Sequence, residues 1–299
     1  MYASQTSRMS KKSILFLVLV LCLQTMQQQA FAQFKNAKYI FIGHCYEPNT
    51  AGDKVDHRLE TFDFSGFDGV WLGGDVCSEA MLNYSTVEYI DGIFDLGNPE
   101  THWALGNHDA RQLNWEWCEE FTNRKTYYAY ASNRITRIIM NSNLVPTNCE
   151  MLDEQFDLII KVCDTINISS NLILLMHHGL WRDVPNIPPP VTFAQSDLVY
   201  WNANCDSVNT QFVDVIYPKL VEVKQRGIDV TCIMGDMGSQ LKKFDMFSSD
   251  SIRFMGCGLH ENDSLYTDQV LFIEQDSLNK KLLFNFHDLD SLVSSKRTY

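Results

Sequence analysis

The sequence is poor in basic residues, and this deficit limits the partners that the chain can bind. It has 299 residues, with 24 Lys and Arg against 37 Asp and Glu, and its formal net charge at pH 7 is −13. An acidic surface of this kind repels the backbone of nucleic acids and the headgroups of anionic membranes. We therefore expect no nucleic-acid-binding surface on this protein.

Sequence motifs that mark two kinds of active site are also missing. None of the nine cysteines stands in a Cys-x-x-Cys pair, which argues against a cysteine-ligated zinc site and a redox dithiol. No Gly-x-Ser-x-Gly elbow occurs, which argues against a serine hydrolase. Cys149 and Cys205 lie in loop-like stretches, and we expect these two to form a disulfide, although spacing alone does not fix the pairing.

The apolar run near the amino terminus is too short for a membrane-spanning helix, which needs about 20 residues. Lys11 and Lys12 precede the apolar stretch Ile14–Leu23, and a small-x-small tripeptide ends at Ala32. This order is typical of a secretory signal peptide, here residues 1–32. We expect cleavage after Ala32, a secreted or periplasmic protein, and no membrane span after cleavage. A retained anchor is the alternative.

The remaining residues, 33–299, fit a single domain. Their number is 299 − 32 = 267, and removal of three basic and no acidic residues gives a net charge of −13 − 3 = −16. This length can form one α/β domain with a large core. Because we find no internal repeat, low-complexity stretch or linker, we predict one domain over residues 33–299.

The hydrophobic pattern predicts alternating strands and helices, followed by strands without helices. Strands are predicted at 38–43, 68–73, 101–105, 126–131, 135–141, 171–176, 229–234, 243–247, 252–256, 269–274 and 281–286. Helices are predicted at 78–94, 114–121, 152–166 and 211–226, the last with a kink at Pro218. Such an order predicts an α/β fold with two packed sheets and helices outside.

One connection in this pattern is long for a compact domain. The loop at residues 180–209 carries the aromatic residues Trp181, Tyr200 and Trp201. Loops of this length often serve as lids or binding walls. A surface loop held in place by its aromatic side chains is the alternative.

Potential metal ligands follow five of the predicted strands. The segments are Gly43-His44-Cys45-Tyr46, Gly73-Gly74-Asp75, Gly106-Asn107-His108-Asp109, His177-His178-Gly179 and Gly235-Asp236-Met237-Gly238. Ligands of open α/β sheets bind at the carboxyl ends of the strands. Oxygen atoms of Asp and Asn together with His nitrogen suit zinc, manganese or iron. Two such cations can generate hydroxide and bind phosphate oxygens, and their charge would offset the acidic surface.

Three of these segments resemble motifs of a known family. Gly74-Asp75, Gly106-Asn107-His108-Asp109 and Met176-His177-His178 look like the second, third and fourth signatures of the calcineurin-like metallophosphoesterases. The resemblance extends in order and spacing over residues 36–290. It implies an α/β fold, a four-layer αββα sandwich of two mixed β-sheets flanked by helices, with a two-metal site between the loops.

The resemblance also implies a role for each motif residue. Asp75 would bridge both metals, and Asn107 and His177 would ligate the second metal. His108 would contact the phosphate or protonate the leaving group, and Asp109 would orient His108. These roles are expectations from the resemblance alone.

The first and last motifs of the family are altered in this sequence. The family's opening Asp-x-His corresponds to His44 and Tyr46, and its closing Gly-His-x-His corresponds to Gly235-Asp236-Met237-Gly238. Asp236 remains a possible ligand, whereas Gly238 has only its carbonyl. We therefore expect one or two ions of Mn, Zn or Fe. The expected ligands are Asp75, Asn107, His177 and Asp236 for one ion, and His44 and Asp75, with Tyr46 as a further candidate, for the other.

Each of these residues also has a simpler interpretation. Asp75 could cap the following helix, and Asn107 with His108 could form a hydrogen-bonded turn. Arg111 could meet a phosphate or be a solvated surface residue, and His102 is expected in the core. Further candidate residues are Glu47, Asp53 and His260 for metal binding, and His178 for a supporting or substrate contact.

Two functions agree with the sequence. The first is an exported phosphoesterase that hydrolyses a phosphate mono- or diester, in a small molecule or a phosphorylated substrate, through metal-bound hydroxide. The second is a catalytically weakened or inactive binding protein of the same fold, in which the aromatic loop recognises a partner or a glycan. Replacement of His108 separates them, because it should abolish turnover in the first and spare binding in the second.

Overall fold

The computed structural model describes residues 36–112, 114–144, 149–192, 194, 212–238, 241–259 and 267–294. Contacts divide the chain into residues 1–36 and residues 37–299, and the sheets and helices of the described residues belong to the second part. The predicted signal peptide, residues 1–32, lies outside the described residues. Within them, no helix is both long and apolar enough to cross a membrane.

The described residues form two mixed sheets. The first has the strand order β11 (Lys281–Asp288), β10 (Gln269–Asp276), β1 (Lys38–Ile42), β2 (Gly69–Leu72) and β3 (His102–Trp103). The second has the order β4 (Tyr128–Ser132), β5 (Ile135–Ile139), β6 (Asn171–Met176), β7 (Asp229–Met234), β9 (Arg253–Cys257) and β8 (Lys243–Phe247). Strands β1, β2 and β3 are parallel, as are β5, β6, β7 and β9, and the remaining strands pair antiparallel at the sheet edges or beside β1.

Alternation along the central strands creates a separate core on each face of each sheet. In β1, Tyr39 and Phe41 pack into the core between the sheets, whereas Ile40 and Ile42 pack on the opposite face. Successive side chains of a strand point to opposite faces, and here both faces are apolar. A strand with this pattern needs a packed layer on each side.

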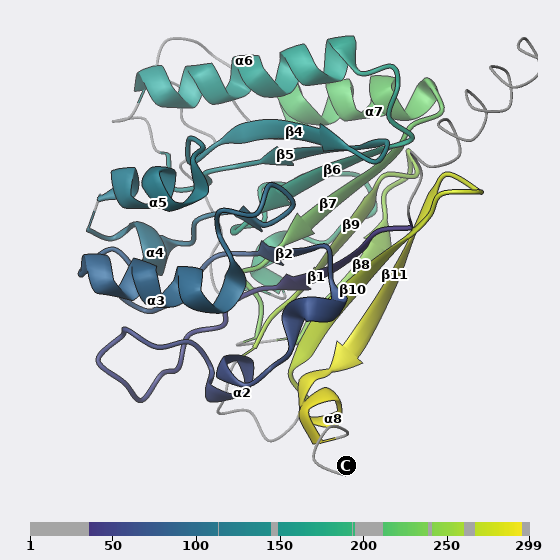
Figure 1. The fold of residues 1–299 in the computed structure, drawn as a ribbon. Coiled ribbons are helices and arrows are strands. Elements are labelled where there is room, and N and C mark those ends of the chain that lie inside the picture. Colours follow the sequence, from purple (N-terminus) through teal and green to yellow (C-terminus); the bar gives the residue numbers. More distant parts are fainter. Residues whose placement is uncertain are drawn as a thin grey trace, which may run out of the picture. The chain divides into compact units, whose positions relative to one another are not determined.

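Three buried cores therefore separate four layers. The middle core joins the two sheets and includes Phe41, Trp71, Ile173, Ile233 and Met255. On its outer face the first sheet is covered by α2 (His57–Glu60), α3 (Tyr84–Phe94), α5 (Trp115–Thr122) and α8 (Leu289–Ser294). The second sheet is covered by α6 (Cys149–Thr165) and α7 (Tyr217–Gln225), as Figure 1 shows. The predicted α/β fold with helix, sheet, sheet and helix layers is confirmed.

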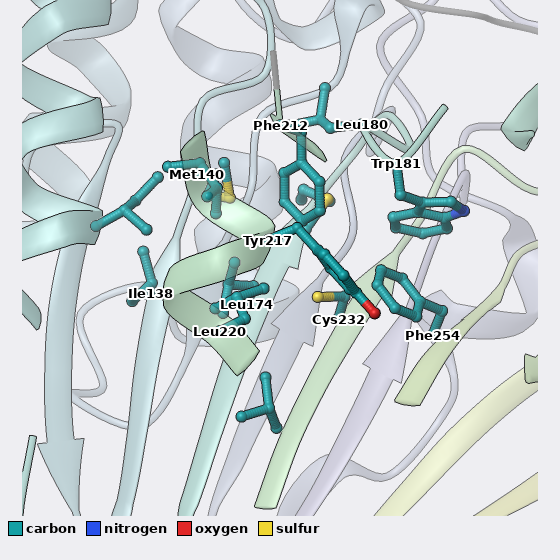
Figure 2. Close-up of a cluster of buried hydrophobic side chains, with 14 of the residues drawn as sticks. Ile138, Met140, Leu174, Leu180, Trp181, Phe212, Tyr217, Leu220, Cys232 and Phe254 are labelled. Atoms are coloured by element: carbon teal, nitrogen blue, oxygen red, sulfur yellow. The ribbon is translucent and has the colours of Figure 1, made fainter. Parts of the chain in front are cut away.

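The core under α7 shows how one helix layer is held. Tyr217 and Leu220 of α7 face Leu174 and Cys232 of the second sheet (Figure 2). All four side chains are buried. Burial of one large apolar side chain is worth roughly 1.5–3 kcal/mol, so this contact contributes substantially to holding the helix on the sheet.

The start of the long loop belongs to the same core. Trp181 is fully buried, and its ring packs edge-on against Phe254 of β9 at a centroid distance of 4.9 Å. This supports the interpretation that aromatic side chains fix the loop, at least where it leaves β6. Residues 193 and 195–211, with Tyr200 and Trp201, lie outside the described residues.

All eleven predicted strands are present, but two helices differ from prediction. The helix predicted over 78–94 begins only at Tyr84. The reason is that Ser78 and Glu79 use their polar groups in contacts with neighbouring loops. The helix predicted over 211–226 consists of a π-helical turn, Phe212–Ile216, followed by α7, in which Pro218 occupies the first turn. Proline is accepted there because its missing N–H would be unpaired in any case.

The cysteines agree with the expected pattern as far as they are described. Cys149 is disulfide-bonded. Its expected partner, Cys205, lies outside the described residues, so the pairing stays a prediction. The free and buried cysteines are Cys45, Cys77, Cys118, Cys163, Cys232 and Cys257.

Candidate metal centre

The carboxyl ends of strands from both sheets approach each other through glycines. A Cβ atom built on Gly235, after β7, would lie 2.0 Å from the carbonyl oxygen of Gly73, after β2. A Cβ on Gly106, after β3, would lie 2.1 Å from Oδ1 of Asp75. No other residue fits at such separations, so these glycines allow the ligand-bearing loops of the two sheets to meet.

Two of the site residues have a strained backbone. His44 and Asp75 have φ angles of 49° and 53°, in the left-handed region that residues other than glycine rarely adopt. The two loops hold each other there, because His44 N donates to the Gly74 carbonyl and Cys45 N to the Asp75 carbonyl, both at 3.0 Å. Strain of this kind costs roughly 1–3 kcal/mol per residue and clusters at functional sites.

The rings of His44 and His177 are held in the same way. Nδ1 of His44 lies 3.0 Å from the Met237 carbonyl oxygen, and Nδ1 of His177 lies 2.8 Å from the Gly73 carbonyl oxygen. A carbonyl oxygen only accepts, so Nδ1 carries the proton in each ring. In the neutral imidazole Nε2 then has a lone pair, which is the arrangement of a metal-ligating histidine.

The Nε2 atoms converge on oxygen donors from the other loops. His177 Nε2 lies 3.4 Å from Asp75 Oδ1, 3.9 Å from Asp236 Oδ1 and 3.2 Å from Asn107 Oδ1. Two ligand atoms that each bind zinc at about 2.1 Å with tetrahedral geometry lie roughly 3.4 Å apart. The donor types and their separations therefore fit a transition-metal ion.

His178 belongs to the same group, although the sequence indicated only a supporting or substrate contact. Its Nδ1 lies 2.7 Å from Ser142 Oγ, and its Nε2 lies 3.1 Å from Asn107 Oδ1. Donor atoms of His177, His178 and Asp236 all lie within 4.8 Å of one another, and all three residues are buried. The signal for His178 is its position: it directly follows a ligand candidate where β6 ends and strand alternation stops.

Asp75 separates two sets of donors. Its Oδ1 faces His177, with Asn107 and Asp236 beyond it, whereas its Oδ2 lies 3.5 Å from Nε2 of His44. The loop that begins at Asp236 turns away, with Gly238 at φ 121° donating to the Leu241 carbonyl. A bridging position for Asp75 is therefore geometrically available, as the resemblance implied. His260, a further candidate, lies outside the described residues.

The buried charges shift each other's titration. Burial opposes ionisation of Asp75, but the charges of His177, His44 and His108 outweigh it and hold the Asp75 pKa well below its usual value. Burial opposes protonation of His177, yet Asp75 raises the His177 pKa to about 9. Burial and the charge of His177 lower the pKa of His178 to about 3. Without metal, the site therefore holds its proton on His177 at neutral pH.

Tyr46 forms a wall of the site. Its ring meets His44 edge-on and stacks on His108, with centroid distances of 4.9 Å in both cases. Burial and the charge of Asp75 raise the pKa of Tyr46, which disfavours phenolate in the absence of a cation. The structure thus places Tyr46 beside the centre without showing that its oxygen is a ligand.

The side chains of His108 and Asp109 contact different parts of the site. The His108 backbone N–H donates to Asp75 Oδ1 at 2.9 Å, and ring Nδ1 lies 3.2 Å from the Ser78 carbonyl oxygen. The Asp109 carboxylate accepts from the backbone N–H groups of Val76 and Gly106 and from Trp103 Nε1. Among the described residues it makes no hydrogen bond to the His108 ring. Ser78, rather than the expected Asp109, therefore orients His108.

Asp109 instead fixes the loops that carry the centre. Both of its oxygens are occupied by hydrogen bonds to the loops after β2 and β3, and the side chain is buried. Burial and the nearby charge of Asp75 raise the Asp109 pKa to about 7. This carboxylate stabilises the backbone around Asp75 rather than facing a substrate.

The structure also places three other residues that the sequence singled out. The half-buried Glu47 carboxylate lies 3.3 Å from Nδ1 of the exposed His57. His102 is fully buried with Nδ1 2.9 Å from the Tyr128 hydroxyl, so its expected place in the core is confirmed. Arg111 is exposed but contacts His108 and Glu79, so it is not simply solvated.

Comparison with known proteins adds one similarity of fold. No family model matches the chain, and no curated protein matches it. Among solved structures, a dimetal phosphatase from Danio rerio is similar with a TM-score of 0.43 and 8% sequence identity, over 83% of this chain and 98% of that chain. No residue role follows from a similarity of this size.

Proposed function

We propose that this chain is an exported, metal-dependent phosphoesterase that hydrolyses a phosphate mono- or diester. One observation carries the proposal: imidazole Nε2 atoms with fixed rings face the buried carboxylates of Asp75 and Asp236 and the amide oxygen of the exposed Asn107. These are the residues of the strand-end motifs that resemble those of metallophosphoesterases, and they come from both sheets.

The donor set favours transition-metal ions over other ligands. Asp75, Asn107, His177 and Asp236 would hold one ion, and His178 lies within reach of the same position. His44 and Asp75 would hold a second, with Tyr46 as a further candidate. A mixture of imidazole nitrogen with carboxylate and amide oxygen suits Mn, Zn or Fe.

Such cations explain how an acidic protein can act on an anion. Bound metal ions supply positive charge for the phosphate oxygens and lower the pKa of water. The chain's own residues fix the geometry: the Gly73 and Met237 carbonyls orient the His177 and His44 rings. The strained backbone of His44 and Asp75 persists because glycines let the neighbouring strand-end loops pack closely and hold both residues in place.

His108 would contact the substrate. It is half-buried beside Asp75, whereas His177 and Asp109 are fully enclosed. Ser78 and Arg111 contact the two ring nitrogens, so His108 has a defined position beside the proposed substrate. Asp109 supports this position only indirectly, through the backbone of the loops.

A test combines metal analysis with assays on generic esters. We expect the purified protein to contain Mn, Zn or Fe and to hydrolyse an aryl phosphate or an aryl phosphodiester. His108→Asn should lower kcat by about a hundredfold or more with metal content unchanged, as expected for a group that acts on the substrate. Protein that stays metal-free and inert after addition of all three metals would overturn the proposal.

Export is proposed from the first 32 residues alone. The lysines, the apolar stretch and the small residues before Gln33 support it. Expression of the full chain in a host with a secretion system, followed by amino-terminal sequencing, tests it. The expected product starts at Gln33 outside the cytoplasm, and an unprocessed protein that stays inside contradicts export.

A binding protein without turnover is the second candidate, and one feature favours it. Gly238 stands where the family motif has a histidine, so the last motif contributes no side chain there. In that case the protein would bind metal and phosphate but show no turnover, and His108→Asn would leave this binding unchanged.

A further inference from the structure

Arg111 lies beside the candidate metal centre, in contact with the His108 ring. The residue follows α4 (Asn107–Ala110), the short helix that carries Asn107 and His108. Its side chain is 44% exposed, with Nη1 3.1 Å from Glu79 Oε1 and Nη2 3.1 Å from His108 Nε2. One arm of the guanidinium therefore touches a carboxylate, and the other touches a motif residue.

The contact with His108 fixes where that ring can act. Nη2 of Arg111 lies 3.1 Å from His108 Nε2 and can only donate, so Nε2 accepts with its lone pair. Nδ1 then carries the ring proton and donates to Ser78, whose carbonyl oxygen and hydroxyl lie 3.2 Å and 3.1 Å away. In this arrangement Nε2 has no proton to donate, and the donors that face outward belong to Arg111.

His108 connects Arg111 to the candidate metal centre. Its backbone N–H donates to Asp75 Oδ1 at 2.9 Å, and its ring stacks on Tyr46 at a centroid distance of 4.9 Å. The guanidinium that contacts this ring therefore lies beside the centre.

Glu79 is a replaceable partner for this arginine. Its side chain is 26% exposed, and it also accepts from Gln112 Nε2 at 3.3 Å. An arginine fork binds carboxylate and phosphate with the same geometry. A phosphate beside His108 can therefore compete with Glu79 for the guanidinium.

We propose that Arg111 is the phosphate-binding residue of this site and that it selects phosphate monoesters over diesters. The selectivity part rests on the proposed phosphoesterase function. A monoester phosphate carries about two negative charges at pH 7, because its second pKa is about 6, whereas a diester carries one. The fixed charge of Arg111 and its paired donors stabilise the dianion more, and Glu79 holds the side chain ready in the absence of substrate.

A surface ion pair without function is the competing explanation, since such pairs often contribute little. The two explanations differ for Glu79. If Glu79 only competes with phosphate, its neutralisation tightens phosphate binding. If Arg111 and Glu79 act together to shape the loop, removal of either one weakens whatever the loop does.

The experiment measures binding of inorganic phosphate to metal-loaded protein by calorimetry, with metal content determined for every variant. The variants are Arg111→Ala, Arg111→Lys, Glu79→Gln and, as a matched control, Arg253→Ala. Arg253 forms a comparable pair with Asp245 at the opposite end of its sheet, where β9 begins. The same proteins are assayed on one aryl phosphate monoester and one aryl diester.

We expect Arg111→Ala to weaken phosphate binding about 10- to 100-fold, as for loss of charged hydrogen bonds. Arg111→Lys should restore part of the phosphate affinity, and Glu79→Gln should tighten phosphate binding severalfold. The control Arg253→Ala should leave the phosphate affinity unchanged. For turnover, Arg111→Ala should lower kcat/KM at least about tenfold more for the monoester than for the diester.

Two results would overturn the proposal. The first is phosphate affinity in Arg111→Ala within twofold of the wild type at equal metal content. The second is weaker binding in Glu79→Gln to the same degree as in Arg111→Ala. If the wild type turns over neither ester, the phosphoesterase function fails, but the calorimetric comparison still decides whether Arg111 binds phosphate.

Discussion

In the cluster around Arg137 each charge faces an opposite charge or an aromatic ring. At the candidate metal centre, by contrast, the imidazole nitrogens of His44 and His177 face the same carboxylate, that of Asp75. The Arg137 guanidinium is fully buried between the sheets, 4.8 Å from the centroid of Tyr39, 5.1 Å from that of Trp71 and 3.0 Å from Glu100. Arg137 thus has its partners within the protein. The donor atoms around Asp75 lie at separations that a bound metal ion would span.

The histidines of the two regions show the same difference. Burial and the charges of Arg137 and Arg124 lower the pKa of His102 well below its usual value, so it stays neutral. His177 is as deeply buried, but Asp75 raises its pKa to about 9. Burial of polar groups is therefore no sign of function by itself. Convergent donor atoms, strained backbone and close glycine contacts distinguish the candidate metal centre.

The largest expected effect comes from removing the shared carboxylate. Asp75→Asn should lose metal and reduce phosphoesterase activity by about a thousandfold or more, because several kcal/mol of transition-state stabilisation depend on the ions. Glu100→Gln, in the other cluster, should keep full metal content. Elemental analysis and kcat/KM on an aryl phosphate measure both. Equal metal content in Asp75→Asn and the wild type would contradict the assignment.

A substitution of Arg137 tests the role of the buried cluster around it. Arg137→Met removes one partner of a buried ion pair and should destabilise the protein by about 3–5 kcal/mol. Its metal affinity, measured on the folded variant, should stay within a few-fold of the wild type. Urea unfolding gives the stability. A stability loss below about 1 kcal/mol would contradict the structural role of Arg137. Loss of metal from the folded variant would show that the two regions depend on each other.

The pH dependence of metal affinity follows from the His177 pKa of about 9. Below this pH the metal must displace one proton from His177, so affinity should rise about tenfold per pH unit between pH 7 and 9 and then level off. Competition with a chelator of known proton affinity measures the slope. A flat profile over this range, after correction for the chelator, is the contrary result.

The smallest expected effect concerns His102, whose folded-state pKa lies below its unfolded value near 6.5. The folded protein resists protonation there, so stability should fall as pH drops below 6.5, by at most about 1.4 kcal/mol per pH unit. His102→Gln should reduce this slope in denaturation experiments at pH 5.5 and 7.5. An unchanged slope would assign the acid sensitivity to other groups, such as His178.

Most of the fold could be predicted because its strands are long, apolar and regularly spaced. Strands such as β6 and β7 are buried on both faces, and this gives continuous apolar runs that sequence shows directly. The segment at residues 78–83 could not be predicted, since helical spacing there is outweighed by contacts of Ser78 and Glu79 with distant loops.

For the candidate site, the sequence indicated which residues gather there better than which side chains contact one another. Strand-end positions indicated Asp75, Asn107 and His177, because polar residues after apolar strands gather at one sheet edge. Which residue orients His108 depends on side-chain geometry across loops, and Ser78 rather than Asp109 does so. Likewise, spacing carries no sign that Arg111 meets His108 rather than solvent.

We infer that the convergent histidines form a metal centre, whereas the equally buried His102 does not. The most direct test is metal content per chain after exhaustive dialysis for the wild type, His177→Ala and His102→Ala, each incubated with Mn, Zn and Fe. The predicted result is at least one ion in the wild type and in His102→Ala, and a loss of bound metal in His177→Ala. Metal-free wild type, or equal metal content in all three proteins, would contradict it.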